Sequence, residues 1–260
     1  MEISMISKDQ DSGLLNIKQA AQMLNVSEVS LRRWTRSGEL ACLRVGPKQE
    51  RRFRQEDLQA YLQKHAAPAR AGLDCGRAAG GSYIDLEGVS IDHGSHMCSL
   101  YKSDLGRVKL AVPFLSEGLS GGDLCFLIAA GETKDHILKR LETVRRNVGG
   151  EIADGGLVVS TGAASGAAMY DYFESAFVEG MRSGARTLRV LGDMTWALDK
   201  GISVDELMDF ELRYNQFLAH QFPVVSLCQY DARRFSGVAI LDALKCHDDT
   251  FKYPLGRFLS

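Results

Sequence analysis

Thiol, imidazole, carboxylate and aromatic side chains in the second half of the chain have the chemistry to bind a small molecule. His96 and Cys98 lie two residues apart, so they share one face of a predicted strand. The run from Cys228 to Asp231 comes at the end of another predicted strand, where the pockets of α/β proteins open. We therefore predict a ligand-binding site formed by His96, Cys98, Tyr101, Trp196, Glu211, Asn215, Cys228, Tyr230 and Asp231.

Three of these candidates are expected outside the strands. Trp196 follows a predicted strand, where its indole could form an aromatic wall. Glu211 and Asn215 are four residues apart and are expected to share a helix face opposite that helix's apolar stripe. Each candidate also has a purely structural interpretation, as a buried thiol, a core indole or a helix-capping carboxylate, and the sequence leaves both interpretations open.

The sequence gives weaker evidence for a metal site or a catalytic site than for a ligand-binding site. Two sets of residues offer metal-ligand atoms without a recognised zinc spacing: His93 with His96 and Cys98, and Cys228 with Cys246 and His247. The six cysteines include no C-x-x-C pair, and no Ser-His-Asp set or carboxylate pair stands out. We predict no metal site and no enzymatic activity, and the sequence identifies no cofactor.

Strand and helix patterns alternate through the region that must position these side chains. Short apolar runs predict strands at residues 97–101, 124–129, 157–160, 188–191 and 224–229. Helical apolar stripes lie between them over residues 137–148, 169–181 and 207–218. This alternation predicts an α/β domain with a mostly parallel sheet and flanking helices. The chain contains no G-x-G and no Gly-Lys dipeptide, which argues against the common phosphate-binding loops.

The first quarter of the chain has a different pattern, that of an α-rich winged helix-turn-helix. An apolar stripe over residues 17–24 predicts a helix, Asn25-Val26 a turn, and Ser27 the N-cap of a second helix that ends at Gly38. Leu31 and Trp34 of that second helix are expected to pack inward. Alternating residues on both sides of Gly46-Pro47 predict a β-hairpin wing, and a third helix follows.

Charge is distributed unevenly between the two regions. Residues 14–65 hold ten Lys or Arg against five Asp or Glu, whereas the rest of the chain holds 21 against 28. The formal net charge of −2 conceals this division. A locally basic module favours double-stranded DNA as a partner. The predicted DNA contacts are Ser30, Arg32, Arg33 and Arg36 on the second helix and Lys48, Arg51, Arg52 and Arg54 on the wing.

These patterns predict three segments. Residues 14–65 form the DNA-binding domain, residues 66–81 (AAPARAGLDCGRAAGG) form a linker, and residues 82–260 form the α/β domain. No heptad helix follows the wing, so we expect a homodimer joined through residues 82–260. No apolar run of about 20 residues and no signal sequence is present, so we expect a cytoplasmic protein that does not contact membranes.

The N-terminal region resembles the MerR/excisionase type of winged helix. The resemblance is carried by IKQAAQMLNVSEVSLRRWTRSGEL at residues 17–40 and by RRFRQEDL at residues 51–58, which opens the helix after the wing. It covers residues 15–62. It departs from a full MerR regulator because no long dimerisation helix follows.

The C-terminal region is similar to the MEDS sensory domain, named after a methylotroph regulator of dichloromethane use. The motifs that carry the similarity span nearly all of residues 90–250: HGSHMCSLY, LAVPFLSEGLSGGDLCFLIA, LRVLGDMTWAL, ELRYNQFL and VVSLCQYDARRFSG. The resemblance implies a RecA/KaiC-like fold without its ATP loop. It also implies a domain that senses small, hydrocarbon-derived ligands.

Together these observations predict a ligand-responsive transcription regulator that binds operator DNA and senses a small-molecule effector. Two other classes stay open. One is a nucleotide-dependent enzyme in the C-terminal domain, which ATP-dependent turnover would reveal. The other is an excisionase-like architectural DNA-binding protein, whose behaviour would not change with any ligand.

Overall fold

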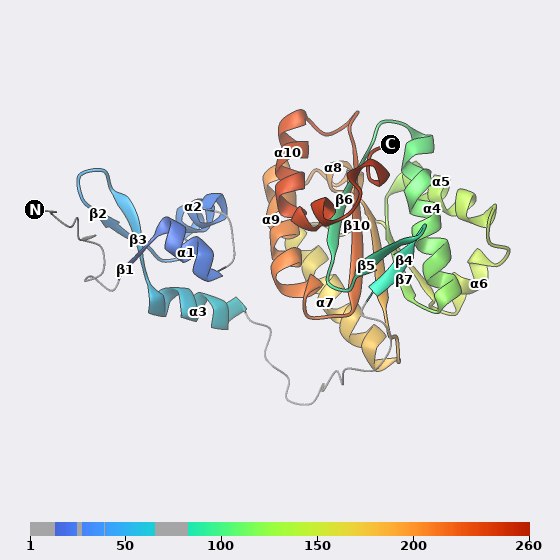
Figure 1. The fold of residues 1–260 in the computed structure, drawn as a ribbon, viewed down its shortest axis with the longest axis horizontal. Helices are drawn as coiled ribbons and strands as arrows, with labels where there is room; N and C mark the ends of the chain where they lie inside the picture. The colour runs from blue at the N-terminus through green and yellow to red at the C-terminus, as the bar shows by residue number, and fades with distance from the viewer. Residues whose placement is uncertain (1–13, 25–27, 39, 66–82) are drawn as a thin grey trace, which may run out of the picture. The chain divides into compact units, whose positions relative to one another are not determined.

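A computed structural model describes residues 14–24, 28–38, 40–65 and 83–260 (Figure 1). The chain divides into two compact units between Gly76 and Arg77. This division falls within residues 66–81, the predicted linker, which lies outside the described residues. The two units are considered one at a time.

The N-terminal unit combines helices with a small antiparallel sheet. In chain order it contains β1 (Leu14–Asn16), α1 (Ile17–Leu24), α2 (Glu28–Ser37), β2 (Leu43–Val45), β3 (Glu50–Arg54) and α3 (Gln55–His65). The strand order is β1-β3-β2, so β2 and β3 form the predicted hairpin and β1 is an addition that the sequence did not indicate. The predicted turn at Asn25-Val26 and the N-cap at Ser27 lie outside the described residues.

The core of this unit is apolar and compact. Leu31 and Phe53 have no exposed surface, and the rings of Trp34 and Tyr61 pack with their centroids 5.2 Å apart. Leu31 and Trp34 therefore pack inward as predicted. Because the inner face of α2 is committed to this core, its outer face is left for solvent or a partner.

The C-terminal unit is built on a five-stranded parallel sheet. Its strands are β6 (His96–Tyr101), β7 (Leu124–Ile128), β8 (Leu157–Ser160), β9 (Leu188–Asp193) and β10 (Val224–Asp231), in the order β6-β10-β9-β7-β8. Every pairing is parallel. The five predicted strands are confirmed, because runs buried on both faces are continuously apolar.

Helices cover both faces of this sheet (Figure 1). One face is covered by α4 (Asp104–Gly121), α5 (Gly131–Glu142) and α6 (Val148–Ala153). The other is covered by α7 (Gly166–Arg182), α9 (Val204–Arg213) and α10 (Gly237–Cys246), with the short α8 (Thr195–Asp199) after β9. The sheet thus separates two apolar cores, and most of the predicted ligand-site residues fall on the side of α7, α9 and α10.

Two helical stripes are interrupted where the sequence predicted continuous helices. The stripe over residues 137–148 breaks after Glu142, and Val144 is 60% exposed because the chain turns before Asn147 caps α6. The stripe over residues 207–218 begins as α9 and continues as a π-helix, η1 (Tyr214–Ala219). A π-turn contains an extra residue, so i,i+4 spacing no longer defines one face across this junction.

The free edge of β6 is covered by segments from the end of the chain. The 3₁₀ helix η2 (Asp248–Lys252) accepts two hydrogen bonds from β6: His96 N donates to Asp249 Oδ2 at 2.9 Å and Cys98 N to Thr250 Oγ1 at 2.7 Å. After η3 (Leu255–Arg257), Leu259 forms a parallel bridge with Leu100. These contacts hold His96 firmly in position.

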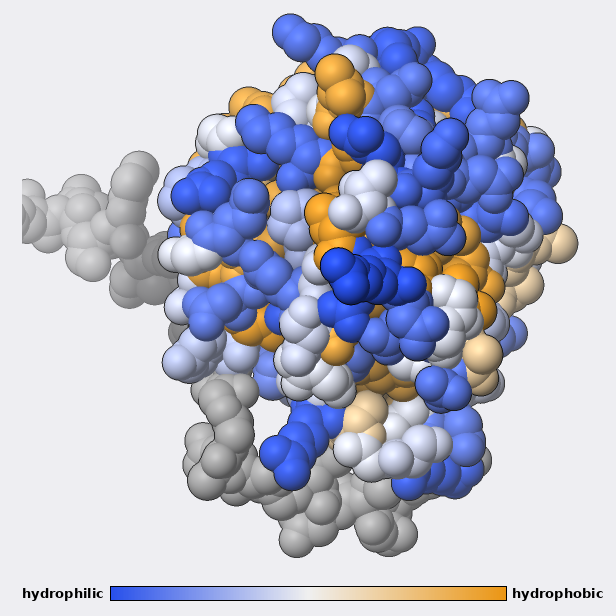
Figure 2. Space-filling view, turned by 90° about the vertical axis from the view of Figure 1, so that its right-hand side faces the viewer, coloured by the Kyte–Doolittle hydropathy of each residue, from blue (hydrophilic) through white to orange (hydrophobic). Residues whose placement is uncertain are grey.

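The unit also carries a hairpin of β4 (Tyr83–Leu86) and β5 (Val89–Asp92), packed on the side of α4. On the face shown in Figure 2, hydrophilic residues cover most of the surface and hydrophobic residues lie in narrow strips between them. Among the described residues, no helix combines the length and the apolar character that a membrane crossing requires.

Candidate functional site

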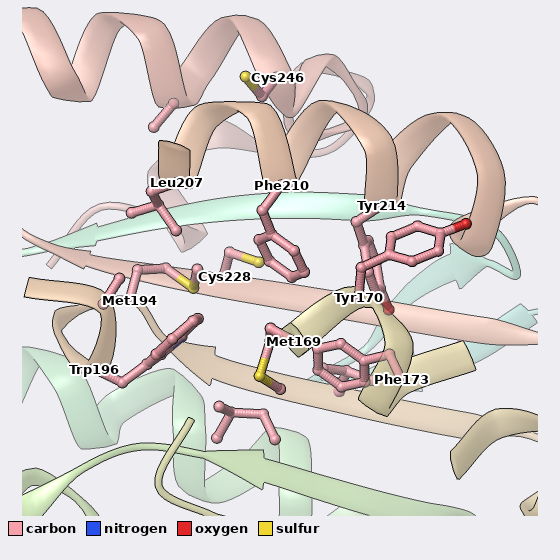
Figure 3. Close-up of a cluster of buried hydrophobic side chains, with 14 of the residues drawn as sticks. Met169, Tyr170, Phe173, Met194, Trp196, Leu207, Phe210, Tyr214, Cys228 and Cys246 are labelled. Atoms are coloured by element: carbon pink, nitrogen blue, oxygen red, sulfur yellow. The ribbon is translucent and has the colours of Figure 1, made fainter. Parts of the chain in front are cut away.

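A small cavity lies inside the core between the sheet and helices α7 and α9. It offers about 20 Å³ to the centre of a water molecule, which is space for roughly one or two waters. Figure 3 shows Trp196, Phe210 and Cys228 directed into this part of the core. The lining residues are buried: His96, Ile128, Phe173, Val190, Gly192, Met194, Trp196, Phe210, Glu211, Tyr214, Ser226 and Cys228.

Trp196 forms one wall of the cavity and is held from two sides. Its ring meets Phe210 edge-on at 6.5 Å between centroids. On the other side Gly162 approaches so closely that a Cβ there would lie 2.2 Å from the indole Cε3. Gly162 also has a left-handed φ of +83°, so both its backbone conformation and the ring require glycine.

At the polar end of the cavity four possible metal-ligand side chains converge from four parts of the chain. They are His96 on β6, Glu211 on α9, Cys228 on β10, and His247 directly after α10. All four are buried, and their donor atoms lie within 4.8 Å of one another. Among these four, His96, Glu211 and Cys228 also line the cavity, so the cluster and the cavity form one site.

Glu211 is the centre of the cluster. Its Oε1 accepts a hydrogen bond from Tyr230 Oη at 2.7 Å. Its Oε2 lies 3.2 Å from His96 Nε2, 3.5 Å from His247 Nε2 and 3.7 Å from Cys228 Sγ. In the described ion pairs Glu211 meets imidazoles and no Lys or Arg.

The surroundings shift the acidities of these groups strongly. Burial, reinforced by the neighbouring His247, lowers the pKa of His96 to about 4. Burial and the Glu211 carboxylate hold the pKa of the Cys228 thiol well above its usual value. Burial alone would raise the pKa of Glu211, but His247 and His96 outweigh it and lower that pKa. At neutral pH the site therefore contains a carboxylate, a neutral His96 and a thiol.

The two imidazoles are oriented by different contacts. His247 Nδ1 lies 2.7 Å from the Ala243 carbonyl oxygen, so it carries the proton and Nε2 faces Glu211. His96 is stacked between His247 and Tyr214, at 4.1 and 4.9 Å between ring centroids. His96 Nδ1 and His247 Nε2 are buried polar atoms without a hydrogen-bond partner in the described structure.

A second polar group lies at the carboxyl ends of the strands. Tyr101 Oη donates to Asp193 Oδ2 at 2.7 Å, and Arg107 lies 3.4 Å from the same oxygen. Asp231 accepts from Arg233 Nη2 at 2.7 Å. Burial, reinforced by Asp193, raises the pKa of Tyr101, so its hydroxyl stays protonated as a donor. This ion-pair group fills the sheet edge where α/β proteins usually bind ligands.

The structure brings some of the predicted ligand-site residues together and separates others. His96, Trp196, Glu211 and Cys228 line the cavity, and Tyr230 bonds to Glu211. The Cys98 side chain is buried in the same apolar core, outside the four-residue cluster. The other three predicted residues, Tyr101, Asn215 and Asp231, do not line the cavity.

Two of the predicted placements need correction. Tyr101 and Asp231 belong to the ion-pair group because side chains alternate along a strand, which directs both away from the sheet face that carries Cys98, Cys228 and the cavity. Glu211 does not lie opposite the apolar stripe of its helix: it is fully buried within it. Because η1 begins at Tyr214, Glu211 and Asn215 do not share a regular helix face.

Sequence reasoning did not anticipate the four-residue cluster. The two metal-ligand combinations it considered were wrong as sets, because His93 pairs with Thr187 and Cys246 faces Met208. The second set does pair His247 with Cys228 correctly, but it adds Cys246 and omits His96 and Glu211. Phe173, Phe210 and Tyr214 were assigned to apolar stripes, which is correct, and they also form the cavity wall. Spacing in the sequence cannot predict a cluster whose metal-ligand atoms come from four separate elements.

The N-terminal unit presents a basic surface that joins α2 to the β-hairpin. Arg51 Nε donates to Thr35 Oγ1 on α2 at 2.8 Å. Burial and the positive charges of Arg44, Arg32 and Arg36 lower the pKa of Arg51, which shows that these guanidinium groups act on one another. Because α2 and the β-hairpin both contribute positive charge to this surface, it favours an anionic partner.

The other predicted DNA contacts divide between two faces. Arg52 and Arg54 alternate with Arg51 along β3, so they point to the opposite face, where Arg52 pairs with Glu50 at 3.0 Å and Arg54 with Glu56 at 3.6 Å. Lys48 is exposed in the hairpin loop. The side chains of Ser30 and Arg33 lie outside the part of the chain that the structure describes.

Comparison with known proteins matches both units. The model of the MEDS family, the methanogen/methylotroph DcmR sensory domain, matches residues 95–248, and a helix-turn-helix domain model matches residues 14–66. The transcriptional repressor DcmR of Methylorubrum extorquens is 47% identical over 257 residues, which cover 98% of this chain and 97% of that protein.

The contact between Gly162 and Trp196 gives a direct test of the cavity wall. Gly155 has a similar left-handed φ of +78°, but a Cβ there would meet nothing within 4 Å. Alanine at either position should cost about 1–2 kcal/mol in backbone strain. Gly162→Ala should in addition displace Trp196, lower the melting temperature further and shift the tryptophan emission, whereas Gly155→Ala should leave the emission unchanged. Identical emission spectra for the two variants would contradict this arrangement.

Proposed function

This chain belongs to the MEDS family of sensory-domain proteins, and on that premise we propose that it is a ligand-responsive transcriptional repressor. Residues 14–65 bind operator DNA through a MerR-like winged helix, residues 66–81 link the domains, and residues 82–260 sense the effector. It acts in the cytoplasm, where operator DNA is found. Effector binding lowers the affinity for the operator.

The observation that carries the proposal is the cavity beside Glu211. Protein interiors are close-packed and leave few voids, so a cavity lined by apolar side chains with a few convergent polar atoms is a natural site for a small molecule. Its walls are aromatic, aliphatic and thioether groups, with Glu211, His96 and Ser226 as polar members. The related repressor supports repression as the outcome of operator binding.

The size of the cavity restricts the effector. With space for roughly one or two waters, it suits a molecule of about two to four non-hydrogen atoms. The apolar lining disfavours a charged effector, because a buried charge without a partner is unstable. A small hydrocarbon or halogenated hydrocarbon such as dichloromethane has the required size and character.

The DNA-binding surface follows from the basic face of the N-terminal unit. With α2 in the major groove, Arg32 and Arg36 reach the DNA together with Ser30 and Arg33 of the same helix. Arg51 and Lys48 of the hairpin lie along the backbone as a wing. Arg52 and Arg54, each beside a carboxylate, contribute less.

A homodimer joined through residues 82–260 completes the proposal. A single winged helix has a small footprint, and repeated half-sites read by a dimer are the usual route to operator specificity. No long helix follows α3 to serve as a coiled coil within the described residues. Sedimentation of the full chain at micromolar concentration should give the mass of a dimer, and a monomer would contradict this part of the proposal.

We infer that the C-terminal unit is a RecA/KaiC-like domain that does not use ATP. Strand β6 passes into α4 through Lys102 and Ser103 alone, without the glycines of a phosphate loop. Asp104, Asp193 and Asp231 lie beside this turn, and their ion pairs occupy the guanidinium groups of Arg107 and Arg233 that a phosphate would need. These features argue against the alternative that the C-terminal unit is a nucleotide-dependent enzyme, and no described feature supports that alternative.

The opposite faces of β3 provide a matched pair of substitutions for DNA binding. Arg51→Ala should weaken binding to specific and random DNA alike and reduce the slope of log K against log salt by about one unit. Arg52→Ala should have a smaller effect, because Glu50 already neutralises this charge. Fluorescence anisotropy at several salt concentrations measures both. A larger loss for Arg52→Ala would reverse the assigned faces.

Dichloromethane is the probe for effector binding. At a hundredfold excess over Kd it should stabilise the C-terminal unit by about 2.7 kcal/mol, raise its melting temperature and release operator DNA. Ile128→Phe fills the cavity and should abolish both responses. Leu127→Phe, which adds the same bulk to the other core, should preserve them. The sensor proposal fails if the parent protein shows neither a thermal shift nor release.

A further inference from the structure

Four of the six distances among the donor atoms of His96, Glu211, Cys228 and His247 are close to those of a tetrahedral metal site, and all four atoms lie within 4.8 Å of one another. Zinc bonds of about 2.0–2.1 Å to nitrogen or oxygen and about 2.3 Å to sulfur place neighbouring ligand atoms about 3.3–3.6 Å apart. Glu211 Oε2 lies 3.2, 3.5 and 3.7 Å from the donor atoms of His96, His247 and Cys228. His96 Nε2 and Cys228 Sγ are 3.3 Å apart.

Hydrogen bonding among these groups is incomplete without a cation. The Nδ1 proton of His247 is directed at the Ala243 carbonyl, and its Nε2 lies 3.5 Å from Glu211 Oε2 without a hydrogen-bond partner in the described structure. An imidazole nitrogen without a proton and a carboxylate oxygen are both acceptors, and such a pair is repulsive in a dry core. A cation between them, either a proton or a metal ion, removes this conflict.

Charge balance favours a divalent metal ion over a proton. A carboxylate, a thiolate and two neutral imidazoles carry a charge of about −2, which one divalent ion neutralises. The resulting neutral site avoids the large cost of isolated charges in the protein interior. Metal binding would deprotonate the Cys228 thiol despite its burial, because the ion is the largest charge in the site.

The outer contacts are those that orient metal ligands. His247 donates its Nδ1 proton to a backbone carbonyl, which is the usual arrangement for a histidine that ligates a metal through Nε2. Tyr230 holds the second oxygen of Glu211, and Asp249 holds the backbone of His96. Imidazole, thiolate and carboxylate in tetrahedral geometry select zinc among the common metals.

We propose that His96, Glu211, Cys228 and His247 bind one divalent transition-metal ion, zinc by preference, at the polar end of the cavity. Because His96, Glu211 and Cys228 also line the cavity, a molecule bound there would lie against the ligand shell. Only this last consequence rests on the proposed sensor function. Metal binding itself requires neither effector nor DNA.

The test is metal analysis of the full-length protein purified without chelators. The parent should retain about one zinc ion per chain, and X-ray absorption should show one sulfur and at least two imidazole ligands. Replacement by cobalt should give the visible bands of a tetrahedral site and a thiolate-to-cobalt charge-transfer band. A parent protein that holds no zinc and gives no such band with cobalt would overturn the proposal.

Two buried cysteines on neighbouring strands provide the matched variants. Cys98 and Cys228 are register partners on β6 and β10, but only Cys228 belongs to the cluster. Cys228→Ser should abolish the charge-transfer band and weaken zinc binding more than about a hundredfold, since even outer-shell changes cost 10–100-fold. Cys98→Ser should retain both. Loss of the band in Cys98→Ser alone would contradict the assigned ligands.

The outcomes separate metal binding from sensing. A zinc-containing protein that ignores dichloromethane would contradict the proposed effector response and leave the metal site standing. A metal-free protein that releases operator DNA with dichloromethane would do the reverse. If Cys228→Ser fails to fold, the X-ray absorption spectrum of the parent still decides whether sulfur is a ligand.

Discussion

The burial of one carboxylate constrains much of the C-terminal unit. Glu211 has no exposed surface, and a charge so far from water is tolerated only when surrounding groups stabilise it. The groups that do so come from β6, β10 and the end of α10, so these elements must keep fixed positions relative to α9. The contacts of η2 with the edge of β6 serve the same end, since they fix the strand that carries His96. Glu211 thus links α9 to three other elements of the unit through buried polar contacts.

Periodicity predicted the architecture well because burial on both faces leaves a plain mark on a strand. All five parallel strands and the placement of Trp34 and Leu31 could be inferred from apolar patterns. The surroundings of Glu211 could not. The spacing rule for helix faces assumes 3.6 residues per turn, and the π-helix at Tyr214 departs from it. A polar residue inside an apolar stripe also reads as surface unless its partners are known, and here they are as distant in sequence as His96 and His247.

The two polar groups of the C-terminal unit divide the sheet between them. At the carboxyl ends of the strands, Arg107 and Arg233 with their aspartates occupy the edge where a parallel sheet ordinarily receives a phosphate. That edge is therefore closed by the chain's own charges. The cavity instead lies beneath the sheet, against α7 and α9, where apolar side chains dominate. The usual ligand position of a parallel α/β sheet is thus filled by ion pairs, and the remaining cavity is apolar, which agrees with the uncharged ligand that we propose.

Burial of the residues that line the cavity has a consequence for the rate at which a molecule can enter it. Every lining residue is buried, so a molecule reaches the interior only during brief openings of the packing around α7 and α9. Association is then limited by how often the core opens, and it falls below the diffusional rate of an exposed site. The same enclosure slows escape once the packing has closed again. For the sensor function proposed above, we therefore expect a response to sustained exposure rather than to momentary changes in ligand concentration, and a signal that persists after the supply of ligand has declined.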